Sequence, residues 1–165
     1  MTEAESKSEI SKNIFLVAGE ESANQYALRL MEEFKDRKDF KFSGIGYKNL
    51  KKKDFNVIYD AAHLSVMGGV EVLKKISEIK KAFALSIAHI QKKNIKTVVL
   101  IDFGGFNLRL AKKIKKISPE TKVLYFISPK FWAWGEKRIK KVINHVDKMY
   151  VIHPFEVDFY NKYSF

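Results

Sequence analysis

The chain has 165 residues, of which 46% are hydrophobic, 30% are charged and none is cysteine. This composition predicts one domain with a real core, and it excludes wholesale disorder, disulfide bridges and cysteine-bound metal sites. The 31 lysines and arginines outnumber the 19 acidic residues, and the resulting formal charge of +12 favours anionic partners such as nucleic acid, phosphorylated ligands or anionic lipid.

Strands and helices are predicted to alternate along the whole chain. After a polar tail at 1–12, apolar or alternating runs predict strands at 13–19, 40–46, 56–60, 97–102, 122–128 and 148–152. Apolar residues at helical spacing predict helices at 22–36, 69–93, 106–117, 135–146 and 155–163, with a charged loop or short helix at 48–54. Residues 13–165 are therefore expected to form an α/β domain, a Rossmann-like parallel sheet with helices on both faces.

The first candidate site follows the first predicted strand, at Gly19, Glu20 and Ser22. Ligands bind beyond the C-terminal ends of the strands in such sheets, and a helix N-terminus offers free N–H groups to an anion. Ser22 is available as the N-cap, so an ordinary capped turn remains an open alternative. A dinucleotide fingerprint is not supported, because Gly19 is the only glycine of this turn.

The second candidate site is the block IDFGGFN at 101–107, which follows the most apolar predicted strand. A carboxylate such as Asp102 at a strand end is well placed to accept a proton from a substrate hydroxyl. A carboxylate that only binds loop N–H groups is the alternative. Asn107 then enters the next helix.

Two further segments have apolar residues that a core does not fully explain. Trp132 and Trp134 lie on a predicted loop after Ser128, where their rings would form a sugar or acyl platform, anchor at a membrane interface, or close the sheet edge. In the helix after residue 69, Val70 and Val72 fall partly off the core stripe among lysines, which is typical of a helix in a lipid interface or of one buried on two sides.

Two basic segments and four histidines complete the candidates. RLAKKIKK at 109–116 and KRIKK at 137–141 would meet phosphates or form solvated helix faces. The histidines are scattered without a metal-binding pattern, so the sequence predicts neither a metal nor a cofactor.

Five blocks, in order, resemble the lipid-A-disaccharide synthase family. They are VAGEES at 17–22, LSVMGGVEVLKK at 64–75, IDFGGFN at 101–107, SPKFWAW at 128–134 and HPFEVDFY at 153–160. The resemblance covers nearly all of residues 13–163. Two positions depart from it: the family's serine–glycine–aspartate is here Ser22-Ala23-Asn24, and the second aspartate of the Asp102 block is Gly105.

The resemblance implies the N-terminal, acceptor-side half of a GT-B glycosyltransferase. Its reaction transfers diacylglucosamine from UDP-2,3-diacylglucosamine to 2,3-diacylglucosamine 1-phosphate, and it forms the β-1,6-linked lipid A disaccharide with inversion and without a cofactor. The family's C-terminal UDP-binding domain is absent from this chain. We therefore expect a missing domain or a separate chain to supply it, and we expect the chain alone to be inactive.

The resemblance also assigns roles to residues of this sequence. Asp102 is the expected catalytic base, and the expected substrate-binding residues are Gly19, Glu20, Ser22, Met67, Gly68, Asn107, Ser128, Trp132 and Trp134. The expected membrane and acyl face consists of Val70, Val72, Leu73 and Ile76.

These roles place the protein in the cytoplasm, peripherally on the inner face of the inner membrane. There an anionic surface attracts each nearby lysine or arginine by ~1 kcal/mol, and no nucleic acid is expected. The alternative is a non-enzymatic basic Rossmann-like module that binds nucleic acid. A nucleotide-dependent oxidoreductase is disfavoured by the missing glycine fingerprint.

Overall fold

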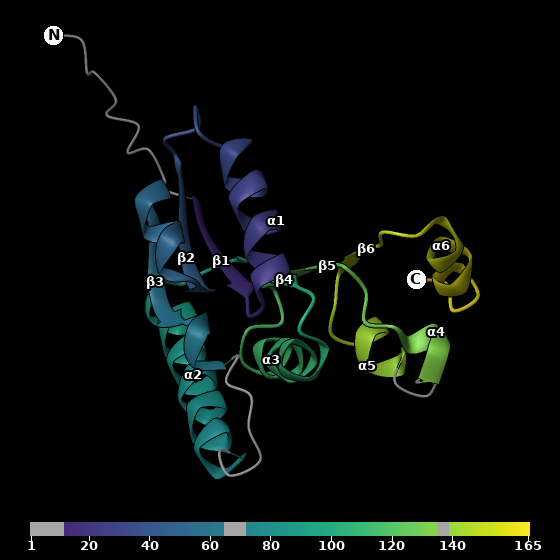
Figure 1. The fold of residues 1–165 in the computed structure, drawn as a ribbon. Helices are drawn as coiled ribbons and strands as arrows, with labels where there is room; N and C mark the ends of the chain where they lie inside the picture. Colours follow the sequence, from purple (N-terminus) through teal and green to yellow (C-terminus); the bar gives the residue numbers. More distant parts are fainter. Residues whose placement is uncertain (1–11, 65–71, 135–138) are drawn as a thin grey trace, which may run out of the picture.

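The computed structural model describes residues 12–64, 72–134 and 139–165, which form a parallel sheet with helices on both faces (Figure 1). The strands in the described residues are β1 (Lys12–Ala18), β2 (Phe40–Gly46), β3 (Phe55–Asp60), β4 (Thr97–Ile101), β5 (Lys122–Phe126) and β6 (Lys148–Tyr150). Their order across the sheet is β3-β2-β1-β4-β5-β6, and every neighbouring pair is parallel. This is the order of a Rossmann-like fold, as the alternation of strands and helices predicts.

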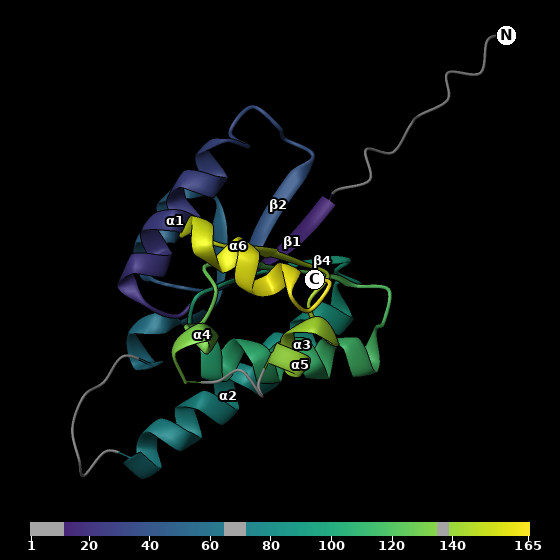
Figure 2. The ribbon, with the colours of Figure 1, turned by 90° about the vertical axis from the view of Figure 1, so that its right-hand side faces the viewer.

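The helices divide between the two faces of the sheet (Figure 2). They are α1 (Glu21–Glu32), α2 (Val72–Lys92), α3 (Gly104–Ile117), α4 (Phe131–Trp134), α5 (Ile139–Ile143) and α6 (Pro154–Asn161), with short 3-10 helices η1 (Lys48–Lys53) and η2 (Ala61–Leu64). Successive strand residues point to opposite faces. Hence Leu16 packs with Ala27 of α1 in one core, while Phe15 packs with residues of α2, α3 and α5 in the other. Both faces of the sheet are therefore buried.

The predicted strands and the main helices are confirmed, but two local predictions are wrong. Ser22 is not the N-cap of α1, because the turn after Gly19 leaves Glu20 extended at the cap position and the helix begins at Glu21. FWAW at 131–134 forms the short helix α4 instead of a loop, and residues 61–64 form an additional 3-10 turn. Of the helix predicted at 135–146, α5 covers Ile139–Ile143, and residues 135–138 lie outside the described part of the chain.

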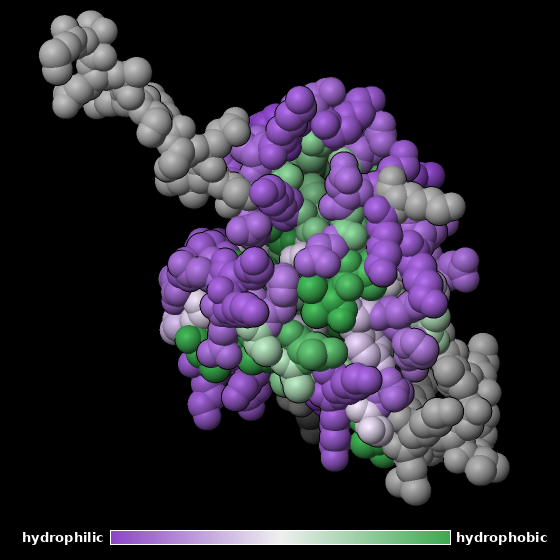
Figure 3. All heavy atoms as spheres, turned by 90° about the vertical axis from the view of Figure 1, so that its left-hand side faces the viewer, coloured by the Kyte–Doolittle hydropathy of each residue, from purple (hydrophilic) through white to green (hydrophobic). Residues whose placement is uncertain are grey.

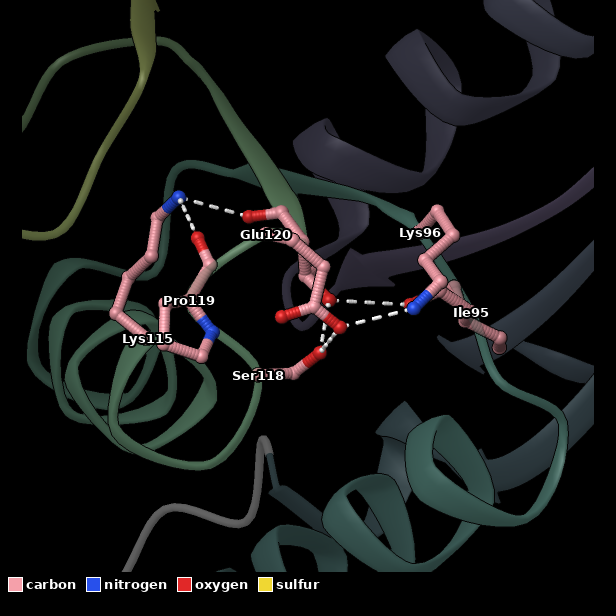
Figure 4. Close-up of polar contacts among 7 residues, drawn as sticks. Ile95, Lys96, Lys115, Ser118, Pro119 and Glu120 are labelled. Carbon is pink, nitrogen blue, oxygen red and sulfur yellow. Dashed lines mark hydrogen bonds and ion pairs between the residues drawn. The ribbon is translucent and has the colours of Figure 1, made fainter.

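The turn between α3 and β5 is fixed by a polar network at the N-terminal edge of the sheet (Figure 4). The Ser118 hydroxyl and the Lys96 ammonium both donate to Glu120 Oε1, at 2.6 and 2.9 Å. The Thr121 hydroxyl donates to the Ile95 carbonyl at 3.2 Å, and Lys115 Nζ donates to the Thr121 carbonyl at 2.8 Å. These contacts join the segments that lead into β4 and β5.

The face of the molecule that carries β3 shows apolar side chains gathered between hydrophilic ones (Figure 3). β3 is an edge strand of the described sheet, and its Val57 and Ile58 are half-buried. Within the ranges that the structure describes, none of the helices is both long enough and apolar enough to cross a lipid bilayer.

Candidate functional site

The centre of the sheet brings the two main sequence candidates together. β1 and β4 are neighbours, with Ala18 paired to Ile101, and the chain leaves them toward opposite edges of the sheet. Such a reversal in strand order opens a crevice at the C-terminal strand ends, where α/β proteins bind ligands. Gly19 and Glu20 follow β1 at this point, and Asp102 follows β4. We call this edge the switch-point site.

The backbone of Asp102 is held in an unusual conformation. Asp102 and Phe103 both have left-handed φ angles, 48° and 47°, which cost residues other than glycine roughly 1–3 kcal/mol each. Three hydrogen bonds hold the segment. The Asp102 N–H donates to the Phe126 carbonyl at 2.9 Å, and the Asp102 carbonyl accepts from the Tyr125 hydroxyl at 2.6 Å and from Asn107 Nδ2 at 2.7 Å. The surrounding fold therefore determines where Asp102 lies.

The environment of the Asp102 carboxyl group raises its pKa above the ordinary value. Burial raises the pKa of this carboxyl group, which outweighs the lowering effects of the Phe103 N–H and of the Lys130 charge. The pKa of Glu20 is raised by burial and then by the negative charge of Asp102. A carboxylate with a raised pKa holds a proton more strongly, which is what a general base requires near neutral pH.

A groove of about 570 Å³ lies beside these carboxyl groups. It is lined by Glu20, Ile79, Lys80, Phe83, Phe103, Gly104, Gly105, Phe106 and Arg109. The rings of Phe103 and Phe106 stack at 5.4 Å, and Phe83 meets Phe106 edge-on at 5.9 Å. Asp102 is not itself among the lining residues, but it immediately precedes Phe103. The groove therefore combines an apolar wall with two cations, Lys80 and Arg109, and suits a ligand that has an apolar part and an anionic part.

Two glycines allow the loops of the switch-point site to pack closely. A Cβ atom on Gly19 would lie 2.5 Å from Cδ1 of Phe103, so the Phe103 ring occupies the space that a side chain would need. A Cβ atom on Gly104 would lie 3.1 Å from Pro129. At Gly105, by contrast, no described atom lies within 4 Å of an added Cβ. The position where the related block has a second aspartate is therefore open.

Two residues that were predicted to contact the substrate, Asn107 and Ser128, are buried and bind neighbouring groups of the protein. The Asn107 side chain is fully buried, and its Nδ2 also donates to the Ile101 carbonyl at 3.2 Å. The Ser128 hydroxyl is buried and bonded to the Tyr160 hydroxyl at 2.5 Å, which ties the end of β5 to α6. Their substrate contacts stay predictions, and in the structure both side chains hold the backbone around the site.

The remaining predicted residues are placed only in part. Ser22 is exposed on the first turn of α1, and Ile76 is exposed on α2. Val72 and Leu73 begin α2, while Trp132 and Trp134 belong to α4. The side chains of these last four residues fall outside the described part of the structure, as do Met67, Gly68 and Val70 entirely.

Several residues of the site are not predicted from the sequence. Phe103 and Phe106 belong to the IDFGGFN block, and their spacing of three residues at the start of a helix was the available signal. Tyr125 lies in a strand whose apolar pattern indicates only core, so nothing marked its hydroxyl as a donor to Asp102. In the described ranges, no three histidine or acidic side chains are grouped so that they would hold a metal ion.

Comparisons with known proteins agree with the sequence blocks. A family model described as "Lipid-A-disaccharide synthetase" matches residues 14–165. The lipid-A-disaccharide synthase of Trichlorobacter lovleyi is 40% identical over 152 residues, which cover 92% of this chain and 39% of that protein. The enzyme of Nitrosococcus oceani is 37% identical over 150 residues, 90% of this chain and 38% of the relative. That of Coxiella burnetii is 36% identical over 153 residues, 92% and 40% of the two chains.

The chain spans about two fifths of the length of the curated relatives that it matches. The match nevertheless includes β1 through α6 and so both carboxyl groups of the switch-point site. Because the family model matches nearly the whole chain, the chain belongs to the lipid-A-disaccharide synthase family.

Proposed function

We propose that the chain forms the acceptor-side Rossmann-like domain of a GT-B lipid-A-disaccharide synthase. Residues 13–165 form this domain, and the UDP-binding domain is supplied by further residues or by a separate chain. The reaction transfers diacylglucosamine from UDP-2,3-diacylglucosamine to 2,3-diacylglucosamine 1-phosphate. The observation that carries the proposal is a carboxyl group with a raised pKa, Asp102, at the reversal in strand order and beside an apolar groove with two cations.

In this mechanism the Asp102 carboxylate accepts the proton of the acceptor 6-hydroxyl. The hydroxyl oxygen forms a bond to the anomeric carbon of the donor sugar as the bond to UDP breaks on the opposite side. The electron pair of that bond leaves with the UDP phosphate, and the anomeric configuration inverts. The pKa of Asp102, raised by burial, supports its role as the proton acceptor.

The groove supplies the binding part of the proposal. Phe103, Phe106 and Phe83 offer a surface for acyl chains, and Lys80 and Arg109 offer charge to the acceptor phosphate. We place the start of α2, where Ile76 is exposed, at the anionic inner face of the inner membrane. The net charge of +12 supports attachment of this kind.

The catalytic role is tested in a fusion of this chain with the remaining part of the Trichlorobacter lovleyi relative. Asp102→Asn is expected to lower kcat by ~10²–10⁴-fold, because it removes the proton acceptor while it keeps the side-chain shape. Asp158→Asn, on the exposed face of α6, is the matched control and is expected to leave kcat unchanged. Near-normal turnover of a folded Asp102→Asn fusion contradicts the role.

A further inference from the structure

A second cavity lies at the opposite end of the sheet from the switch-point site. It has a volume of about 810 Å³ and lies at the N-terminal ends of β1, β2 and β3, the end where β1 begins (Figure 1). A seven-residue strand such as β1 separates the two ends by about 20 Å. This cavity therefore has no part in the chemistry proposed above.

Six polar side chains meet on the face of the sheet that α2 covers. Lys41 and Ser43 are two residues apart on β2 and share a face. Asn13 of β1 pairs in register with Lys41, and Asn56 of β3 pairs with Ser43. His89 lies near the end of α2, and its Nε2 atom is 3.0 Å from the Ser43 hydroxyl. Lys93 follows one turn later, and its backbone N–H donates to the His89 carbonyl. We call Asn13, Lys41, Ser43, Asn56, His89 and Lys93 the basal cluster.

The position of the basal cluster is unusual for a parallel sheet. Strands covered on both faces are normally apolar throughout, because helices bury both sides. Here three neighbouring strands each place a polar side chain on the same face, and Ser43 is only 8% exposed. Ser43 is buried and His89 is half-buried, whereas Lys41, Asn56 and Lys93 are exposed and can reach a ligand from solvent.

The charge of the cavity indicates an anion. Each of the six side chains can donate a hydrogen bond, and none of them is acidic. Asp54 is the single carboxylate among the described residues that line the cavity, against six lysines and arginines. Some of these cations are already engaged: Lys35 and Lys53 contact Glu32, and Arg37 contacts Asp39.

Lys41 and Lys93 of the basal cluster form no salt bridge with another residue of the described ranges. Two ammonium groups and two amides thus remain for a ligand, beside the Ser43 hydroxyl and the His89 ring, which bond to each other at 3.0 Å. Burial lowers the pKa of His89, and the charges of Lys93 and Lys92 lower it further, which favours the neutral ring with one N–H.

We propose that the basal cluster binds the phosphate groups of an anionic ligand. Phosphate oxygens accept several charge-assisted hydrogen bonds at once, which matches two ammonium groups surrounded by neutral donors. The basal cluster lines the part of the cavity that faces α2, and the whole cavity, which also extends to Met31 and Phe34 on the α1 face, lies within the usual range of volumes for small-molecule sites. The ligand is either a free nucleotide or inorganic diphosphate, or the headgroup of an anionic lipid, because these sources share the same chemistry.

The site is tested by calorimetric titration of sodium pyrophosphate into the whole chain at low salt. We expect saturation at one pyrophosphate per chain, and affinity at least about tenfold lower in Lys41→Ala/Lys93→Ala, because two charge-assisted hydrogen bonds are lost. Lys112→Ala/Lys116→Ala removes the same charge from the exposed face of α3 and is expected to change the affinity less than twofold. Equal weakening in the two double variants, or no saturable binding, overturns the proposal.

A second measurement needs no variant. In ¹H–¹³C spectra of the wild-type chain, pyrophosphate is expected to shift the ring signals of His89 and to leave those of His63 in place. Binding without a shift at His89 overturns the location.

Flotation with phosphatidylglycerol vesicles separates the two sources of the ligand. If vesicle binding is lost in Lys41→Ala/Lys93→Ala and is displaced by pyrophosphate, the ligand is a lipid headgroup. If vesicle binding is unaffected while pyrophosphate still saturates the site, the ligand is a free phosphate compound. Both results support the phosphate site itself.

Discussion

Asp102 is held in position by hydrogen bonds to its backbone carbonyl oxygen as well as by its place after β4. Tyr125 and Asn107 both donate to that oxygen, and Asn107 also holds the carbonyl of Ile101. The two donors come from different elements, β5 and α3. The left-handed turn that presents the carboxyl group is thus determined by one side chain of the helix that follows it and one side chain of the next strand.

Removing the two donors is expected to have unequal effects. Tyr125→Phe leaves the Asp102 carbonyl with Asn107 as donor, so the free energy of unfolding should fall by about 1 kcal/mol. Asn107→Ala removes two hydrogen bonds at a fully buried position and should cost roughly 2–3 kcal/mol. Urea denaturation measures both changes. A larger loss for Tyr125→Phe than for Asn107→Ala would contradict this arrangement.

Gly105 is the second residue of α3 and has open space around it. Gly105→Asp is expected to raise the free energy of unfolding by about 0.5–1 kcal/mol, because it improves helix propensity and places a negative charge at a helix N-terminus. Gly105→Ala is the control, since it contributes the propensity alone. Thermal unfolding compares the two. Destabilisation by either variant would show that the space around Gly105 is not open.

The sequence predicts some site residues better than others. Gly19, Glu20 and Asp102 were predicted because they follow strands, and parallel strands bring their C-terminal ends to one edge. Tyr125, Lys130 and Lys80 were not, because their proximity to the site depends on which strands become neighbours and on the packing of α2. No local sequence pattern indicates which strands are neighbours or how α2 packs.

At the scale of elements, length and periodicity decide what is predictable. The long helices α2 and α3 and the apolar strands β1 and β4 are predicted closely, because each repeats its pattern over several residues. The four-residue helix α4 is shorter than one repeat of the pattern used to recognise helices, so it was interpreted as a loop. The N-cap residue Glu20 makes no side-chain hydrogen bond to the helix. The preference for serine at N-caps rests on such a bond, so it does not predict where this helix begins.

The turn from α3 to β5 gives the fold a dependence on pH. Hydrogen bonds from Ser118 and Lys96 lower the pKa of Glu120 from its ordinary value of 4.5 to about 2. Because the folded pKa is the lower one, the stabilisation is complete above pH 4.5 and is lost as the pH falls toward 2.

The wild type is therefore expected to be more stable than Glu120→Gln at pH 7, with a difference that shrinks between pH 4.5 and 2. Urea denaturation over this range measures the difference. Lys96→Met, which removes one donor, should show a weaker dependence on pH than the wild type. A difference that stays constant with pH would exclude Glu120 as its source.

At the scale of the whole molecule, the net charge of +12 and the exposed Ile76 of α2 predict attachment to anionic membranes. The chain is expected to float with phosphatidylglycerol vesicles, and less so as salt rises, because surface electrostatics are screened. Ile76→Ser should weaken binding by about tenfold, since it removes one apolar side chain from the lipid contact.

Ile152→Ser is the matched control, because Ile152 is 51% exposed, compared with 44% for Ile76, but follows β6. Equal losses for the two variants would exclude α2 as the contact surface. Filter binding to DNA distinguishes the alternative of a nucleic-acid module: steep salt dependence on DNA without any preference for lipid would favour that alternative.

The contact between Gly19 and Phe103 has a consequence for substrate choice. The Phe103 ring packs against the Cα atom of Gly19, which carries no side chain. The position of the ring in the groove wall therefore depends on this residue being glycine. A methyl group there would push the ring outward and narrow the passage. Under the proposed function, Gly19 thus limits the width of the acyl groups that the groove accepts, and relatives with a larger residue at this position should prefer slimmer or shorter acyl groups.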